Sequence, residues 1–146
     1  MNVSIIEDIG SEPVNLDMAK EWMNIDYPDW DVLITRLIVA SREKSESMSG
    51  QSYGIRVYEV TGNQKNEKVY PIGPFIEDVE FEGEDGVKKY RYRAGFHICP
   101  ELLKLAILQR VATGFAYRQN GVMDAVSMAV NQSHHYEMAY RRDMYV

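Results

Sequence analysis

The sequence predicts a mainly helical α+β fold, in which a small helical bundle carries a β-hairpin or small antiparallel sheet between its second and third helices. Three patterns indicate this fold: apolar residues at helical spacing up to residue 50, alternating β-branched and aromatic residues from 52 to 95, and a nearly all-apolar helix after Pro100. The 146 residues are about one domain in length. We therefore predict a single domain with four parts, namely N-terminal helices (1–51), a β insertion (52–98), a core helix (99–121) and a C-terminal segment (122–146).

The first two helices are predicted from capping residues and apolar spacing. Asn15 is a candidate N-cap, and the helix that it opens should end before Pro28, which cannot continue it and lies in an Asp-rich turn. A second helix is predicted from about Trp30 to Met48, where apolar residues recur with a period of 3.6. Gly50 follows as its C′ residue.

Alternating runs predict strands at residues 53–60, 68–72, 76–82 and 88–95. The last two runs fit one antiparallel register, which places Phe81 opposite Tyr90 and Val79 opposite Tyr92 on the same face. Each cross-strand pair contributes about 0.2–1 kcal/mol, and a slip of one residue would move the aromatic side chains to the charged face. On that other face the register forms three ion pairs: Asp78 with Arg93, Glu80 with Arg91, and Glu82 with Lys89.

A third helix is predicted from about Glu101 to Asn120, opened by Pro100 and followed by Gly121. Its first three turns are apolar on nearly every side, and such a helix must be covered all round. We therefore expect this helix, which bears Leu103, Ile107 and Val111, to pack on the second helix and on a neighbouring copy of the chain. A short helix is predicted at 122–130, with a hinge at 131–133.

The charge and the single cysteine exclude several classes of protein. A net charge of −6 and a pI near 5.1 argue against a general duplex-DNA binder, which needs Lys and Arg to neutralise phosphates. Cys99 is the one cysteine, so no internal disulfide framework or multi-Cys metal site is possible. It is either a small buried apolar residue or, at a helix start, a reactive thiol. Residues 1–8 lack the pattern of a signal or a membrane span, so we expect a cytosolic protein without a membrane partner.

Two groups of residues have the composition of a metal site. Adjacent histidines at 134 and 135 precede Glu137, but neighbouring side chains on a helix or strand diverge, so one ion rarely takes both. The aspartates at 26, 29 and 31 lack the Gly and the bidentate Glu of a calcium loop. No phosphate-binding Gly loop or His-Glu-x-x-His sequence is present. We expect no metal, no other cofactor and no enzymatic activity, and a small host enzyme with an unrecognised site is the least favoured class.

The segment Lys88–Arg93 interleaves basic and aromatic residues, a pattern typical of strands that stack bases and hold phosphates. It supports an alternative function, a single-stranded nucleic-acid binding module. The predicted hairpin argues against this alternative, because its acidic strand would already match the charge of Arg91 and Arg93.

The C-terminal segment combines tyrosine, arginine and methionine from residue 134 to 146. Tyrosine and arginine are enriched at interface hot spots, whereas methionine is as often a gap filler in a core. Terminal segments of this kind are mobile unless they dock on a partner. We interpret this segment as a docking element whose removal leaves the fold standing.

Three segments share a further pattern in their order along the chain. The first is formed by Glu12–Lys20 and Asp29–Gly50, a short helix, an Asp-rich turn and a longer helix. The second is Tyr70–Val79, a proline-containing segment that leads into a strand. The third is Tyr90–Arg118, which runs from Tyr-x-Tyr-x-Ala-Gly-Phe through Cys-Pro to an apolar helix ending in Tyr-Arg. Over residues 12–118 this order resembles the head-tail connector (adaptor or head completion) proteins of long-tailed bacteriophages.

The resemblance implies a structural virion protein and no catalysis. Proteins of this family form a ring, usually a dodecamer, that docks beneath the portal and extends the DNA channel from the filled head toward the tail. The implied partners are other copies of the chain, the portal protein, the next neck or tail-completion protein, and passing genomic DNA that is not bound specifically. The implied location is the virion neck, after assembly in the host cytoplasm. In the family the C-terminal segment commonly reaches the portal, which assigns that contact to Tyr140, Arg141, Arg142 and Tyr145.

Overall fold

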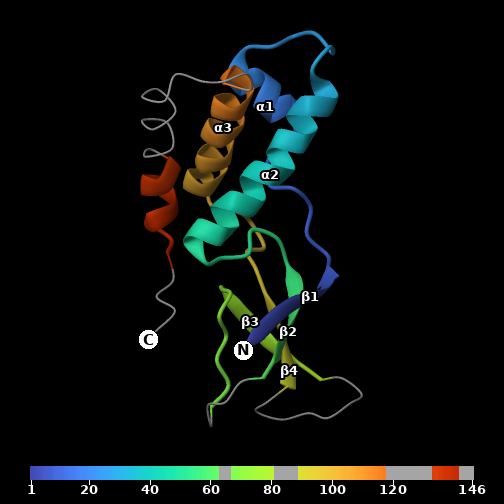
Figure 1. The fold of residues 1–146 in the computed structure, drawn as a ribbon, viewed down its shortest axis with the longest axis vertical. Helices are drawn as coiled ribbons and strands as arrows, with labels where there is room; N and C mark the ends of the chain where they lie inside the picture. Colours follow the sequence, from blue (N-terminus) through green and yellow to red (C-terminus); the bar gives the residue numbers. More distant parts are fainter. Residues whose placement is uncertain (63–66, 81–88, 118–132, 142–146) are drawn as a thin grey trace. The chain divides into compact units, whose positions relative to one another are not determined.

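The computed structural model describes residues 1–62, 67–80, 89–117 and 133–141. The chain separates into two compact units, each with its own secondary structure (Figure 1). In the described residues, one unit contains Met1–Ser11 and Gly50–Ile98 and is built on a β-sheet, and the other contains Glu12–Ser49 and residues 99–141 and is helical. The predicted α+β class is confirmed, but the sheet forms a unit of its own, so the mainly helical emphasis is not supported.

The sheet unit contains four antiparallel strands in the order β1-β2-β4-β3. They are β1 (Asn2–Asp8), β2 (Arg56–Thr61), β3 (Phe75–Val79) and β4 (Lys89–Ala94). The edge strand β1 was not predicted, because its mostly exposed residues lack the alternation that marks a half-buried strand. The predicted strand at 68–72 is not a strand in the structure.

The core of this unit is a row of aromatic and small residues on one face of β2 and β4. Tyr90 and Tyr92 are almost completely buried because alternate residues of a strand share a face. Their hydroxyl groups hydrogen-bond the backbone of the segment at 68–72, with distances of 2.8 Å to the Val69 amide nitrogen and 3.0 Å to that of Ile72. That segment therefore crosses the tyrosine side chains instead of pairing with a strand.

The predicted register of β3 and β4 is wrong by one residue. Arg93 lies opposite Glu77, and Asp78 lies opposite Tyr92. The predicted register assumed an isolated hairpin, whereas β4 also pairs with β2. Consequently Arg93 forms an ion pair with Glu77, and Arg91 binds the β2 carboxylate of Glu59 at 2.8 Å.

The remaining members of the predicted ion pairs have other surroundings. The carboxylate of Asp78 accepts a hydrogen bond from the Tyr70 hydroxyl at 2.8 Å and lies 4.0 Å from the Lys68 ammonium group. Burial first, and this hydrogen bond second, raise the pKa of Tyr70 to about 12. Glu80 is exposed. Phe81 and Glu82, which are the predicted partners of Tyr90 and Lys89, lie outside the described residues.

A glycine contact fixes the path of the chain around β2. Gly95 has a φ of 136°, a conformation open to glycine and strained for other residues. A Cβ atom at this position would lie 2.1 Å from the carbonyl oxygen of Gly54. The chain can therefore leave β4 at this place only with glycine at position 95.

The helical unit contains α1 (Leu16–Met23), α2 (Asp31–Ser49), α3 (Glu101–Ala116) and a short helix at residues 133–138 (Figure 1). The predicted caps are confirmed, since Asn15 Oδ1 accepts a hydrogen bond from the Met18 amide at 2.9 Å and Gly50 has a φ of 69°. The first two helices end within two residues of their predicted bounds. The helix predicted at 122–130, the end of the third helix beyond Tyr117 and most of the predicted hinge lie outside the described residues.

Helix α3 packs on α1 and α2 and forms the core of this unit. Leu103, Ile107 and Val111 have no exposed surface, and Ile34 and Ile38 of α2 are buried with them. The predicted packing of α3 on the second helix is confirmed. Its contact with a neighbouring copy stays a prediction, and it would use α3 residues other than these three, such as Leu102, which is 39% exposed.

Candidate interaction surfaces

Ser52 stands in a Gly-x-Ser-x-Gly sequence, but it has no exposed surface and its hydroxyl donates a hydrogen bond to the Gly54 carbonyl at 2.6 Å, so it is not an accessible nucleophile. In residues 1–62, 67–80, 89–117 and 133–141, no three His, Cys, Asp or Glu side chains are grouped so that they could hold a metal ion. Burial raises the pKa of Cys99 to about 12, which leaves this thiol protonated and unreactive at neutral pH. Within the same part of the chain, no helix is long and apolar enough to cross a membrane.

Two carboxylates that were considered as metal ligands form ion pairs instead. Asp31, at the start of α2, binds the ammonium group of Lys20 at 2.8 Å and so connects α2 to α1. Glu137 binds the guanidinium group of Arg110. Each carboxylate is occupied by a cation of the protein itself, and both pairs hold helices together.

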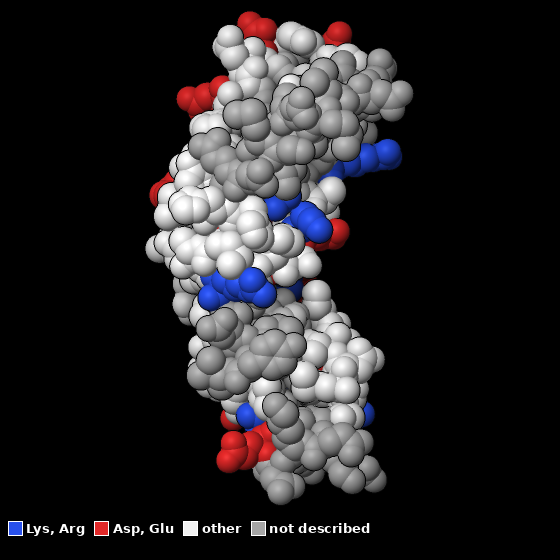
Figure 2. Space-filling view, turned by 60° about the vertical axis from the view of Figure 1, so that its left-hand side comes forward, with Lys and Arg blue, Asp and Glu red and all other residues white. Residues whose placement is uncertain are grey.

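The basic-aromatic strand β4 does not present its aromatic rings to a ligand. Tyr90 and Tyr92 are 1% and 0% exposed, so neither ring can stack on a base. Arg91 and Arg93 already bind carboxylates of the flanking strands. On the face shown in Figure 2, Lys and Arg side chains lie in separate small groups, without a continuous basic surface among the described residues. These features disfavour the nucleic-acid alternative.

The C-terminal segment begins with a helix that is part of the fold. Glu137 has no exposed surface and forms two charge-assisted hydrogen bonds with Arg110 of α3, Nε to Oε1 at 2.6 Å and Nη2 to Oε2 at 2.8 Å. The buried Ser133 hydroxyl adds a contact to Oε1 of Gln109 at 3.2 Å. Helix 133–138 is therefore fixed to α3 by a bidentate ion pair.

The four residues predicted to dock on the portal lie beyond this helix. Tyr140 is half-buried and Arg141 is exposed, while Arg142 and Tyr145 lie outside the described residues. Sequence reasoning treated residues 134–146 as one segment, because Glu137 and Arg110 are far apart in the sequence. The structure separates a packed helix from the residues that follow it.

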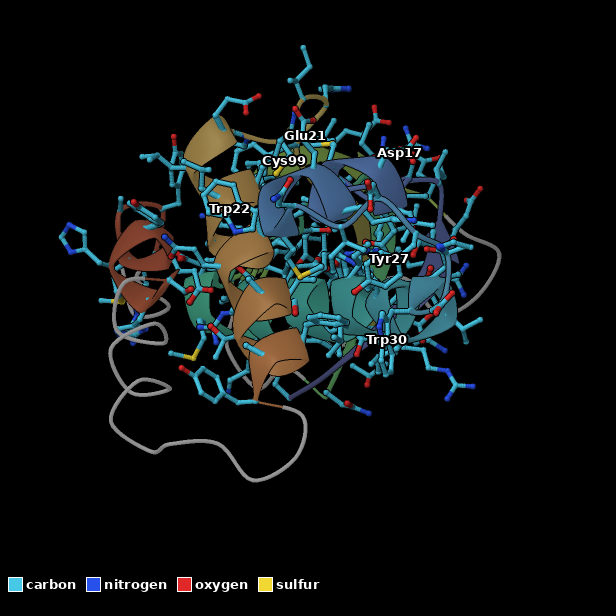
Figure 3. All side chains as sticks on the ribbon, turned by 90° about the horizontal axis from the view of Figure 1, so that it is seen from above. Asp17, Glu21, Trp22, Tyr27, Trp30 and Cys99 are labelled. Carbon is cyan, nitrogen blue, oxygen red and sulfur yellow. The ribbon has the colours of Figure 1, made fainter. Side chains whose placement is uncertain are left out.

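Helix α1 carries a surface that the sequence analysis did not identify. A hollow of about 330 Å³ is lined by Met18, Glu21, Trp22 and Leu108. The Trp22 side chain is 46% exposed, and Asp17 lies one turn before Glu21. Figure 3 shows the residues labelled on α1 at its outer side. Neither carboxylate forms an ion pair with a described residue. The sequence signal for this surface was a tryptophan next to two carboxylates that are four residues apart on a short helix.

Helix α2 presents a second surface, of opposite charge. Val32, Arg36 and Ala40 are all exposed and follow one another at four-residue spacing, which places them along one ridge of the helix. Val32 is 71% exposed, which is unusual for a valine. Arg36 forms no ion pair with a described residue. By contrast, Arg42 of the same helix binds both Glu12 and Glu46.

Comparison with known proteins shows a shared fold. The sequence matches no protein-family model and no curated protein. Over its whole length the structure resembles a chain from the neck of an empty gene transfer agent (GTA) particle computed with C6 symmetry, with a TM-score of 0.75, 11% identity and 98% of that chain covered. A chain from the virion of a native gene transfer agent particle gives a TM-score of 0.70 and 12% identity, with the same coverage. The fold thus agrees with the resemblance to head-tail connector proteins.

Proposed function

We propose that this protein is a structural component of a virion neck, a head-tail connector that forms a ring and docks on the portal. The observation that carries the proposal is the full-length structural match to a chain of a particle neck. The three collinear sequence segments that resemble connector proteins support the same function independently of the match. The exposed surfaces of α1 and α2 also offer places where other chains can bind, as a structural component requires.

The proposed assembly is a dodecameric ring. The neck that contains the matching chain was computed with C6 symmetry, and a dodecamer is compatible with a sixfold axis. A ring requires a heterologous interface, in which two different surfaces of neighbouring copies meet. The proposed channel conducts genomic DNA without binding it, which fits the net charge of −6.

The proposed partners are the portal on one side and the next neck or tail-completion protein on the other. We assign the portal contact to Tyr140, Arg141, Arg142 and Tyr145, beyond the helix that is fixed by Glu137. Tyrosine and arginine suit such a contact, because they bury a large area and form specific hydrogen bonds.

Electron microscopy tests this function directly. The purified protein is imaged alone and after mixing with the portal protein of the same genome. We expect a ring with a central hole that stacks on the portal. A chain that stays monomeric and does not bind the portal contradicts the proposal. A truncation that ends at Met138 keeps Glu137 and is the matched variant, since it should fold, form the ring and lose the portal contact.

A further inference from the structure

The exposed surfaces of α1 and α2 carry opposite charges, and each also exposes an apolar side chain, Trp22 on α1 and Val32 on α2. We propose that the α1 surface of one copy, formed by Asp17, Glu21, Trp22 and the adjoining hollow, receives the α2 ridge of the next copy, formed by Val32, Arg36 and Ala40. This inference rests on the proposed ring and names the residues that close it. The occupant of the hollow is a second copy of this chain.

The acceptor surface combines a hydrophobic hollow with unpaired negative charge. Ala19 is the buried residue of α1, and Asp17 and Glu21 stand two residues before and after it. Two residues correspond to about 200° of rotation in an α-helix, so both carboxylates point away from the core. Trp22 follows Glu21 on α1 and borders the hollow with Met18 of α1 and Leu108 of α3. This surface favours a partner with a small apolar side chain and a neighbouring cation.

The α2 ridge provides these groups in the required order. Ile34 is fully buried, and Val32 and Arg36 again stand two residues before and after it, on the outer side of the helix. Val32 fits the hollow beside Trp22, and Arg36, one turn further, reaches Glu21. The guanidinium group can bind a carboxylate with two hydrogen bonds, and the small Ala40 permits close approach of the α1 helix.

Charge also determines which half of α2 makes the contact. In the first half of α2, Asp31 is paired with Lys20, whereas Arg36 has no ion-pair partner among the described residues. In the second half, exposed Glu43 stands beside exposed Lys44, and the two charges offset each other. The contact therefore uses the first half of α2, around Arg36. Because the acceptor and the ridge are different surfaces, each copy can bind one neighbour on each side. Such a heterologous interface produces a ring when its rotation closes.

The test reverses one charge at a time in the full-length chain. Glu21→Arg and Arg36→Glu each place like charges together, and each should weaken assembly at least about tenfold. The assembled fraction is measured by native mass spectrometry and electron microscopy, with and without the portal protein. Glu80→Arg is the control, because this exposed carboxylate belongs to the sheet unit and to neither proposed surface, so its reversal should leave assembly unchanged.

Mixing the two variants gives a result that misfolding cannot produce. Neither Glu21→Arg nor Arg36→Glu should assemble alone, but each interface between the two different variants joins opposite charges. An equimolar mixture should therefore form rings in which the variants alternate. If both variants assemble like the wild type, or if the mixture stays unassembled, this inference is overturned while the ring proposal stands. A wild-type chain that neither assembles nor binds the portal overturns both.

Discussion

Removing the Glu137 carboxylate should destabilise the helical unit strongly. In Glu137→Ala, the Arg110 guanidinium loses two short hydrogen bonds, of 2.6 and 2.8 Å, in a place where its own side chain is only 10% exposed. Removing one member of a buried ion pair costs about 3–5 kcal/mol, because the remaining charge is left without compensation. We expect a loss near the lower end, about 3 kcal/mol, since Arg110 retains some access to water. For a chain of this length, that corresponds to a decrease in Tm of about 10 °C.

The assay is urea unfolding at neutral pH, followed by tryptophan fluorescence. Trp22 and Trp30 are the only tryptophans, and both belong to the helical unit, so the signal reports the unit that contains the ion pair. All variants are compared at one protein concentration, because ring formation would stabilise the folded state. Glu101→Ala is the control. It removes the 83%-exposed partner of Lys104 on the same helix α3, and exposed pairs contribute less than about 1 kcal/mol.

Two results distinguish the cost of leaving Arg110 unpaired from the cost of lost packing in Glu137→Ala. Replacing both partners with apolar residues, as in Arg110→Met with Glu137→Leu, should recover most of the stability that Glu137→Ala loses, because no unpaired charge remains. If Glu137→Ala unfolds within about 0.5 kcal/mol of the wild type, the ion pair does not fix helix 133–138. That result would return the whole C-terminal segment to the docking element predicted from the sequence.

Three further predictions concern the core of each unit. Ile107→Asp places an unpaired charge at a fully buried position of α3 and should cost more than about 4 kcal/mol, so a soluble folded monomer would count against the assignment of this core. Gly95→Ala should lower the free energy of unfolding by at least about 2 kcal/mol, measured by thermal unfolding, because its φ of 136° is strained for alanine and the new Cβ would meet the Gly54 carbonyl. Gly62→Ala is the control, and it should cost less because open space surrounds this position. Cys99 should resist iodoacetamide at pH 8 until the chain unfolds. Burial raises the pKa of Cys99 to about 12, above its ordinary value of 9.0. The stability that this burial contributes is therefore present below pH 9 and decreases from pH 9 to 12. Rapid labelling of the folded protein would refute the burial of Cys99.

Local chemistry made the helices predictable. Asn15 and Gly50 fix helix ends through a side-chain hydrogen bond and a positive φ, and both effects depend on residues within a few positions. The register of β3 and β4 was not predictable in this way, because Arg91 is paired by Glu59 from a strand 32 residues earlier in the sequence. The edge strand β1 was missed for a related reason, since an exposed edge imposes little pattern on its residues.

The same difference between local and long-range contacts decided which parts of the candidate surfaces could be predicted. Burial of Leu103, Ile107 and Val111 followed from the apolar character of α3, which any fold of this chain has to cover. The Arg110–Glu137 pair joins residues 27 positions apart, so no local pattern could reveal it. The hollow beside Trp22 requires α3 to supply Leu108 to the surface of α1, and such a juxtaposition exists only after folding.

The structure changes where an interface between copies should be sought. A helix that is apolar on every side seemed to need a neighbouring subunit, yet α1, α2 and helix 133–138 leave its core residues no exposed surface. A small chain can cover most of such a helix with its own short elements, so an all-apolar pattern does not by itself identify an interface. Interfaces between separately folded subunits must keep each subunit soluble beforehand, and they combine apolar groups with charge. The Trp22 hollow with Glu21, and Val32 with Arg36, have this composition. For a ring of such chains, the informative signal is therefore exposed charge beside exposed apolar residues, on two surfaces of opposite sign.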